Sequence, residues 1–192
     1  MFYRIAKAIM TIVVYFLFAP RVIDKESFPS TGGAIVYSNH TSNFDPVILG
    51  IVLPRPISFM AKAELFQNPI ISWVLKGLGA FPIKRGQADI ASIKKSLQIL
   101  RNQQILGIFP EGTRNKSGSE LGTFANGIAS IAHKAKVPVV PVAIKGGYKP
   151  FKRITVTIGQ PIYFDEFQHQ KSSKELLDNM SSQMENALKE ML

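Results

Sequence analysis

Short apolar segments rich in β-branched residues alternate with segments of helical periodicity along most of this chain. We expect strands at residues 34–38, 57–61, 80–84, 105–109, 139–144 and 154–158. Helices are expected at residues 46–53, 68–78 and 124–135, after Asp89, and from Ser172 onward. Strands that alternate with helices are typical of a parallel sheet covered on both faces. The sequence therefore predicts a single α/β domain with a mostly parallel central sheet, preceded by a short apolar N-terminal helix.

Two of the expected helices carry start signals. Asp89 is the expected N-cap of one helix, and its apolar face comprises Ile90, Ile93, Leu97 and Leu100. The pattern Ser172-x-x-Glu175 is a capping box, which predicts that the terminal helix begins there. That helix carries Leu177, Met180, Met184, Leu188 and Met191 on one face. We expect this face to pack against the core.

The chain of 192 residues contains no cysteine. This length suits one domain with a large core that needs no disulfide or metal for stability. The absence of cysteine excludes a disulfide scaffold, a thiolate nucleophile and a metal site with cysteine ligands. We expect neither a metal nor a resident cofactor.

The chain is basic, with 23 Lys and Arg residues against 13 Asp and Glu and a net charge of +10. Residues 1–153 hold 20 basic and 7 acidic side chains, whereas residues 154–192 hold 3 basic and 6 acidic ones. A basic body favours an anionic partner: nucleic acid, a membrane surface or a phosphorylated substrate. Nucleic acid is the least favoured, because the chain shows no run of five basic residues and no helix-turn-helix, zinc-finger or RNP-like pattern.

Residues 8–19 form an uncharged apolar segment, which Arg4 and Lys7 precede and Arg21 follows. A helix of that length spans about 18 Å, too short for a hydrocarbon core of about 30 Å. Three interpretations remain: an anchor in one leaflet, a buried core helix, or a signal peptide. We prefer the anchor, because basic residues at both ends suit lipid headgroups. The expected division is a membrane-anchoring helix at 1–20 and the main domain at 21–192.

His40 and Asp45 are candidate catalytic residues. His40 follows the strand expected at 34–38, at the kind of strand end where parallel α/β sheets bind ligands. If the loop folds back, Asp45 can accept a hydrogen bond from Nδ1 of His40 and leave Nε2 as a general base. A structural alternative stays open, in which Asp45 only caps its helix and His40 only lines a turn. A serine hydrolase is disfavoured, because no G-x-S-x-G motif occurs.

A second cluster, residues 109–114 with the sequence FPEGTR, follows the strand expected at 105–109. Gly112 permits a backbone conformation that other residues avoid, and the planar guanidinium of Arg114 suits a phosphate. We interpret Glu111 as an acceptor that holds backbone amides or Arg114 in position. The alternative is a turn with a solvated salt bridge.

Four sequence blocks in a fixed order match one family pattern. They are NHTSNFDP at 39–46, FMAKAEL at 59–65 through GAFPIKR at 79–85, FPEGTR at 109–114, and VPVVPV at 137–142. Together they resemble the glycerolipid acyltransferases, the family of 1-acyl-sn-glycerol-3-phosphate acyltransferases with the H-x4-D motif. The resemblance extends from about residue 32 to about residue 163.

The resemblance implies that residues 21–192 form an acyltransferase domain. It would transfer a fatty acyl group from a thioester to the sn-2 hydroxyl of lysophosphatidate, giving phosphatidate in phospholipid biosynthesis. His40 would be the catalytic base and Asp45 its orienting partner, and Glu111 would shape the site. The residues expected to bind the substrate phosphate are Arg114, Lys62, Arg85, Gly112 and Thr113. The protein would lie peripherally on the cytoplasmic face of the cell membrane, with membrane lipids as partners.

The acceptor and the donor stay open. The family often has a lysine where this chain has Ala125, in Phe124-Ala125-Asn126-Gly127, which leaves room for another lysophospholipid or a lyso-aminolipid acceptor. The resemblance implies acyl-CoA or acyl carrier protein as the donor, and the basic body favours the acidic carrier. A non-catalytic membrane-binding protein on the same fold is the alternative from another class.

Overall fold

The computed structural model describes residues 2–84, 89–115, 121–122 and 124–192. Within these ranges, one sheet contains seven strands in the spatial order β1-β7-β6-β2-β5-β3-β4. The strands are β1 (Arg21–Ile23), β2 (Ala34–Ser38), β3 (Ile57–Lys62), β4 (Phe81–Ile83), β5 (Ile105–Ile108), β6 (Val139–Lys145) and β7 (Thr155–Ile158). Neighbouring strands pair in parallel except β6 and β7, which are antiparallel. This confirms the predicted mostly parallel sheet.

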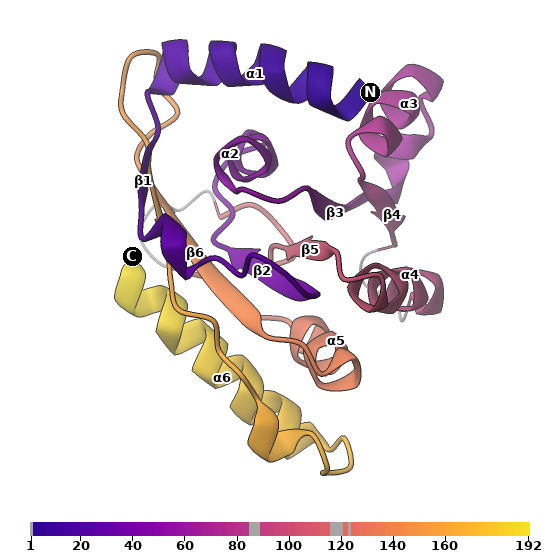
Figure 1. The fold of residues 1–192 in the computed structure, drawn as a ribbon. Helices are drawn as coiled ribbons and strands as arrows, with labels where there is room; N and C mark the ends of the chain where they lie inside the picture. The colour runs from indigo at the N-terminus through magenta and orange to yellow at the C-terminus, as the bar shows by residue number, and fades with distance from the viewer. Residues whose placement is uncertain (1, 85–88, 116–120, 123) are drawn as a thin grey trace.

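Helices cover both faces of the sheet, as the alternating pattern predicted. They are α1 (Phe2–Phe18), α2 (Asp45–Val52), α3 (Pro69–Gly77), α4 (Ile90–Arg101), α5 (Gly127–Ala135) and α6 (Lys174–Met191). Short 3-10 helices occupy Lys25–Ser27, Ala63–Phe66 and Asp165–Phe167. Figure 1 shows α1, α2 and α3 on one side of the sheet and α4, α5 and α6 on the other.

The two faces of the central strand β2 build two separate hydrophobic clusters. Val36 packs in a cluster with residues of α1 and α2, whereas Ile35 and Tyr37 pack in a cluster with residues of α4, α5 and α6. Successive side chains of a strand point to opposite faces, so one strand contributes to both clusters. All five residues of β2 are buried, which is typical of a parallel strand covered on both sides.

The start of α4 agrees with the sequence, and most of its predicted apolar face does too, since Leu100 is buried and Leu97 packs against the core. Asp89 caps the helix, because its side chain accepts a hydrogen bond from the backbone N–H of Ser92 at 3.0 Å. Ile90, which we expected on the apolar face, is 65% exposed, whereas Ser92 and Ser96 are buried. The hydroxyl of Ser96 donates to the Ser92 carbonyl at 2.7 Å. Small serines whose hydroxyls bond within the helix can therefore lie against the sheet.

The terminal helix begins one residue later than its capping box predicted. Its N-cap is Ser173, whose hydroxyl oxygen accepts from the backbone N–H of Leu176 at 3.1 Å. The assignment of the cap to Ser172 was therefore wrong. Adjacent serines offer the same capping chemistry, and the docking of the helix selects between them.

The N-terminal helix α1 has a buried face and an exposed apolar face. Val14 and Phe18 are buried in the same hydrophobic cluster as residues of α2. The large apolar side chains exposed on α1 are Ile9, Ile12, Val13, Tyr15 and Phe16. In the described part of the chain, no helix is long and apolar enough to span a bilayer.

Lys7, one of the basic residues that we expected at lipid headgroups, forms a hydrogen bond within the protein. Its ammonium donates to the carbonyl oxygen of Leu53 at 3.2 Å, at the end of α2. Burial lowers the pKa of Lys7, and the positive charge of Lys25 lowers it further. A cation at a helix C-terminus stabilises the last carbonyls, so Lys7 fastens α1 to α2.

Candidate active site

The loops that follow β6, β2 and β5 leave the sheet at the same edge. These three strands are parallel neighbours with β2 in the middle. His40 follows β2, and the segment from Glu111 to Arg114 follows β5. This carboxyl edge is where ligands of parallel α/β sheets bind, so the topology gathers the predicted site residues there.

Asn39 fixes the start of the loop that carries His40. Its buried side chain donates to the carbonyl oxygen of Ile144 at 2.9 Å and accepts from the N–H of Ile144 at 2.8 Å. The side-chain amide thereby extends the pairing of β2 with β6 by one more step. The sequence pattern did not single out Asn39 for this role, since the pairing partner lies 105 residues away.

The structure brings His40 and Asp45 into contact, with Nδ1 of His40 2.8 Å from Oδ2 of Asp45. The loop folds back because the backbone N–H of Asp45 donates to the Ser42 carbonyl at 3.2 Å and α2 starts at Asp45. An ionised carboxylate only accepts hydrogen bonds, so this contact places the imidazole proton on Nδ1. The Nε2 atom then has a lone pair, and it makes no hydrogen bond with any described residue.

The carboxylate of Asp45 is fully buried, with a side-chain exposure of 0% against 12% for His40. Besides His40, its Oδ2 atom accepts from the backbone N–H groups of Thr41 at 2.8 Å and Ser42 at 2.7 Å. Its Oδ1 atom accepts from the hydroxyl of Tyr148. Burial of a carboxylate is costly unless such donors compensate it. The dense set of donors therefore explains how a buried carboxylate is accommodated beside His40.

The ring and the backbone of His40 are both held by the β5 loop. The imidazole stacks on Phe109, with ring centroids 4.2 Å apart and an interplanar angle of 22°. The N–H of His40 donates to Oε1 of Glu111 at 2.8 Å, and its carbonyl accepts from the N–H of Asn115 at 2.7 Å. These contacts immobilise His40 relative to β5, which is the rigidity that a positioned base requires.

Glu111 bridges two loops through its carboxylate. One oxygen accepts from His40, and the other accepts from the backbone N–H of Gly122 at 2.9 Å. Gly112 follows in a tight turn at a φ of +68°, with its N–H donating to the Phe109 carbonyl at 3.1 Å. A left-handed φ favours glycine at this position. Glu111 thus contacts backbone amides, one of the two arrangements considered from the sequence.

The expected phosphate-binding residues differ in how close the structure brings them to His40. Thr113 and Arg114 are exposed in the turn whose next residue, Asn115, bonds the His40 carbonyl. Arg114 makes no hydrogen bond or ion pair with the residues that the structure describes. Lys62 ends β3, which β5 separates from β2, and pairs on the surface with Glu64 at 3.4 Å. Arg85 lies outside the described residues.

Tyr148 belongs to this site but was not predicted from the sequence. It follows β6 after Gly146 and Gly147, and its hydroxyl donates to Asp45. The available signal was its place just past a strand end, but only the strand order shows that β6 adjoins β2. Burial raises the pKa of Tyr148, and the charge and hydrogen bond of Asp45 raise it further.

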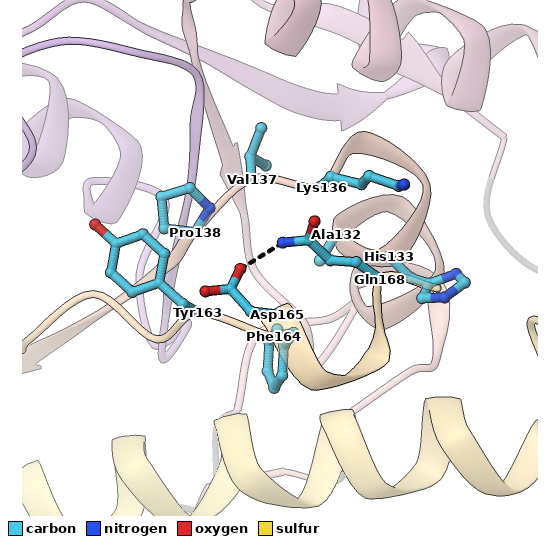
Figure 2. A pocket seen from close by; sticks show the side chains of 9 residues that line it. All are labelled: Ala132, His133, Lys136, Val137, Pro138, Tyr163, Phe164, Asp165 and Gln168. Atoms are coloured by element: carbon cyan, nitrogen blue, oxygen red, sulfur yellow. Dashed lines mark hydrogen bonds between the residues drawn. The ribbon is translucent and has the colours of Figure 1, made fainter. Parts of the chain in front are cut away.

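A surface pocket at the opposite edge of the sheet contains none of the expected site residues. Figure 2 shows its lining, in which Val137 and Pro138 directly precede β6. His133 also lines it, and Nε2 of that histidine lies 3.1 Å from the Phe167 carbonyl oxygen. Because His40 follows the parallel strand β2, the pocket and His40 lie at opposite ends of the strands.

Comparisons with known proteins match the family that the four sequence blocks resemble. The profile of the family described as Acyltransferase matches residues 19–145. The 1-acyl-sn-glycerol-3-phosphate acyltransferase of Bacillus subtilis is 37% identical over 177 residues, covering 89% of this chain and 87% of that protein. The enzyme of the same name from Streptococcus pneumoniae is 33% identical over 135 residues, covering 67% of this chain and 49% of that protein. The chain thus spans about half the length of the streptococcal relative.

A solved structure shares the fold. The 1-acyl-sn-glycerophosphate acyltransferase PlsC of Thermotoga maritima superposes with a TM-score of 0.67 at 21% sequence identity. The superposition covers 98% of this chain and 97% of that one. The α/β architecture is therefore shared along nearly the whole length of both chains.

Proposed function

The chain belongs to the acyltransferase family, and from this membership we propose that it transfers a fatty acyl group from a thioester to the sn-2 hydroxyl of lysophosphatidate. The product is phosphatidate, the thiol of the donor is released, and the reaction serves phospholipid biosynthesis. The names of the relatives from Bacillus subtilis and Streptococcus pneumoniae support this acceptor. The observation that carries the proposal is the contact between His40 and the buried Asp45.

In the proposed reaction, Nε2 of His40 takes the proton of the acceptor hydroxyl as its oxygen attacks the thioester carbonyl. The tetrahedral intermediate collapses, the C–S bond breaks, and the imidazolium returns its proton to the departing thiolate. Asp45 orients the ring and stabilises the imidazolium. A positioned base of this kind contributes about 10²–10⁴-fold to the rate. No acyl-enzyme is needed, because the thioester is already activated.

Arg114 is our first choice for binding the acceptor phosphate. It is exposed in the β5 loop, next to the residue that bonds the His40 carbonyl. Its planar guanidinium can form two parallel hydrogen bonds to a phosphate. Lys62 is a weaker candidate because it already pairs with Glu64.

Replacement of Arg114 by alanine should raise the KM for lysophosphatidate about 10- to 100-fold and change kcat much less. The range corresponds to the loss of charge-assisted hydrogen bonds worth about 1.5–3 kcal/mol. Steady-state kinetics on detergent-solubilised acceptor measures it. Arg114→Lys, which retains the charge but loses the fork, should lie between wild type and Arg114→Ala. A monoacylglycerol acceptor, which has no phosphate, should be used equally by all three proteins, and a KM unchanged in Arg114→Ala rejects the role.

In our proposal, the positive charge of the chain decides which acyl donor is preferred. Acyl-CoA and acyl carrier protein both present a phosphopantetheine thioester, and the acidic carrier is attracted to the basic residues 1–153. We therefore propose the carrier protein as the preferred donor. This preference should weaken at high salt, because screening shortens the reach of surface charges.

A matrix of donors and acceptors tests the proposed function. Purified protein is incubated with acyl carrier protein or acyl-CoA thioesters and with lysophosphatidate, other lysophospholipids or lyso-aminolipids. Mass spectrometry then identifies the diacyl products. Phosphatidate as the main product supports the proposal, and the absence of any diacyl product refutes it.

The second candidate function is transfer of the acyl group to a different acceptor, and Ala125 is the residue that favours it. Its backbone N–H donates to the Pro110 carbonyl at 3.0 Å, so the position where the family often has a lysine adjoins the Glu111 turn. A missing cation beside the site favours a different headgroup, such as that of a lyso-aminolipid. The acceptor arm of the matrix decides between the two.

The protein is proposed to lie peripherally on the cytoplasmic face of the cell membrane. In this proposal α1, which lies within the anchor expected at residues 1–20, contacts the lipid. Exposed apolar side chains gather on α1 and α3, which lie on the same side of the sheet in Figure 1. On α3 they are Ile70, Ile71, Trp73 and Val74. Large exposed apolar surfaces mark contact with a membrane or a partner. The lipid substrates of an acyltransferase favour the membrane.

The double change Ile12→Asp and Phe16→Asp should lower binding to vesicles of phosphatidylglycerol and phosphatidylethanolamine at least about tenfold. The two side chains are 73% and 70% exposed, so their replacement leaves the core intact, while two carboxylates oppose insertion into an anionic leaflet. Co-sedimentation measures the effect. Ile90→Asp is the matched control, since Ile90 is 65% exposed on α4 across the sheet. Equal binding by the double variant and the control contradicts the proposed surface.

A further inference from the structure

The two carboxylate oxygens of Asp45 have different partners. Oδ2 bonds His40 and two backbone amides, whereas Oδ1 accepts from the hydroxyl of Tyr148. The terminal torsion of an aspartate side chain is soft, and its rotation would turn Oδ2 out of line with Nδ1 of His40. A donor fixed on the opposite oxygen resists that rotation.

The ring of Tyr148 is itself held by two other aromatic side chains. It stacks on Phe44 with ring centroids 6.0 Å apart, and its ring meets Phe18 edge-on at 5.7 Å. Phe18 ends α1, and Phe44 directly precedes α2. Aromatic pairs in these arrangements are attractive beyond their buried area, so packing fixes the direction of the Tyr148 hydroxyl.

The loop that carries Tyr148 is fastened to the end of α1. The N–H of Phe151 donates to the Leu17 carbonyl at 2.6 Å, and that of Ile154 donates to the Phe18 carbonyl at 3.1 Å. Figure 1 shows this loop, in orange, beside the C-terminal end of α1. The loop starts at Gly146, whose φ is +117° and where a Cβ would lie 2.8 Å from the Arg153 carbonyl oxygen. Such a conformation requires glycine.

The hydroxyl of Tyr148 donates a hydrogen bond to Asp45 and does not act as a base. Burial raises the pKa of its hydroxyl, as do the negative charge of Asp45 and the hydrogen bond between them. The hydroxyl therefore keeps its proton at neutral pH. Among the residues that the structure describes, the other ionisable groups that hydrogen-bond to the His40 loop are Asp45 itself and Glu111, which accepts from the His40 backbone.

We infer that Tyr148 is a positioning residue, which clamps the second oxygen of Asp45 and so keeps His40 aligned for proton transfer. The inference rests on the proposed function, in which His40 is the base. Because the clamp acts through Asp45, its loss should slow the chemical step and leave substrate binding unchanged.

Replacement of Tyr148 by phenylalanine retains the ring stack and removes only the hydroxyl. We expect kcat to fall about 10- to 100-fold, as small misplacements of a catalytic group do, with the KM values for both substrates within about twofold of wild type. Tyr37→Phe is the matched control. It also removes one buried hydroxyl, which donates to the Met184 carbonyl at 2.9 Å in the other hydrophobic cluster. That variant should have the wild-type kcat.

A double-mutant cycle shows whether Tyr148 acts through Asp45. In an Asp45→Asn background, the further change Tyr148→Phe should lower kcat less than twofold, because the carboxylate that the clamp serves is already gone. Multiplicative effects of the two changes overturn the inference.

The Nδ1 proton resonance of His40 gives a second measurement that needs no substrate. The chain has three histidines, so His133→Gln and His169→Gln variants assign the resonance. It should shift or broaden in Tyr148→Phe and stay unchanged in Tyr37→Phe. An unchanged resonance in Tyr148→Phe overturns the inference even if activity falls. If wild-type protein shows no acyl transfer, the proposed function fails while the resonance still tests the clamp.

Discussion

Replacement of His40 by alanine should lower kcat by about 10²–10⁴-fold, the range that a positioned general base contributes. The change removes the Nε2 atom that takes the proton of the acceptor hydroxyl. KM values should change little, because the proposed phosphate contacts of Arg114 lie in another loop. The measurement is the initial rate of diacyl product formation at saturating donor and acceptor.

The loss must be separated from a loss of structure. The side chain of His40 lies in a loop, is 12% exposed and contacts Phe109 and Asp45. Its removal should leave the helices and strands in place, so the far-UV circular dichroism spectrum should be retained. His133→Ala is the matched control, since His133 lines the pocket at the opposite edge of the sheet. A His40→Ala protein with more than about a tenth of the wild-type kcat would show that His40 is not the base.

Asp45→Asn should lower kcat by a similar factor and should also lower the free energy of unfolding. The amide cannot stabilise an imidazolium as a carboxylate does, so proton transfer to His40 becomes harder. The buried side chain also loses charge-assisted hydrogen bonds from Thr41 and Ser42, which contribute about 1.5–3 kcal/mol each to stability in favourable cases. Rate assays and urea denaturation measure the two effects.

Asp165→Asn provides the control for this change. Asp165 accepts a hydrogen bond from Gln168 at the pocket of Figure 2, far along the strands from His40. That variant should keep the wild-type kcat. If Asp45→Asn loses stability but retains activity, then Asp45 only holds the loop before α2 in place through Thr41 and Ser42. It does not cap α2 as the structural alternative from the sequence supposed, because the N-cap of α2 is Phe44.

The local features of this chain were predictable because they depend on short stretches of sequence. The strand at Ala34–Ser38 has the predicted bounds, and the cap of α4 is Asp89 as predicted. The contact between His40 and Asp45 spans only five residues. The short loop between His40 and Asp45 is closed by its own backbone hydrogen bond and by the start of α2. The spacing of the two residues in the sequence was therefore enough to predict their contact.

Features that depend on how a helix or strand packs against the rest of the fold could not be predicted from the sequence. The apolar periodicity of α4 pointed to Ile90, but the helix packs with Ser92 and Ser96 toward the sheet. Lys7 lies in an apolar helix and reaches the end of α2. The strand β1, only three residues long, carries too short a pattern to predict and exists because it pairs with β7.

The sequence by itself determined the α/β class, the parallel sheet and the placement of His40 and Glu111 after strands. Periodicity and strand ends are local properties, and local backbone preferences enforce them. Only the tertiary structure decided that β6 lies beside β2, so that Ile144 pairs with Asn39 and Tyr148 reaches Asp45 from 103 residues away. The order of the strands depends on how the faces of the sheet and the helices pack together, which involves contacts between residues far apart in the sequence. No single stretch of sequence therefore encodes it.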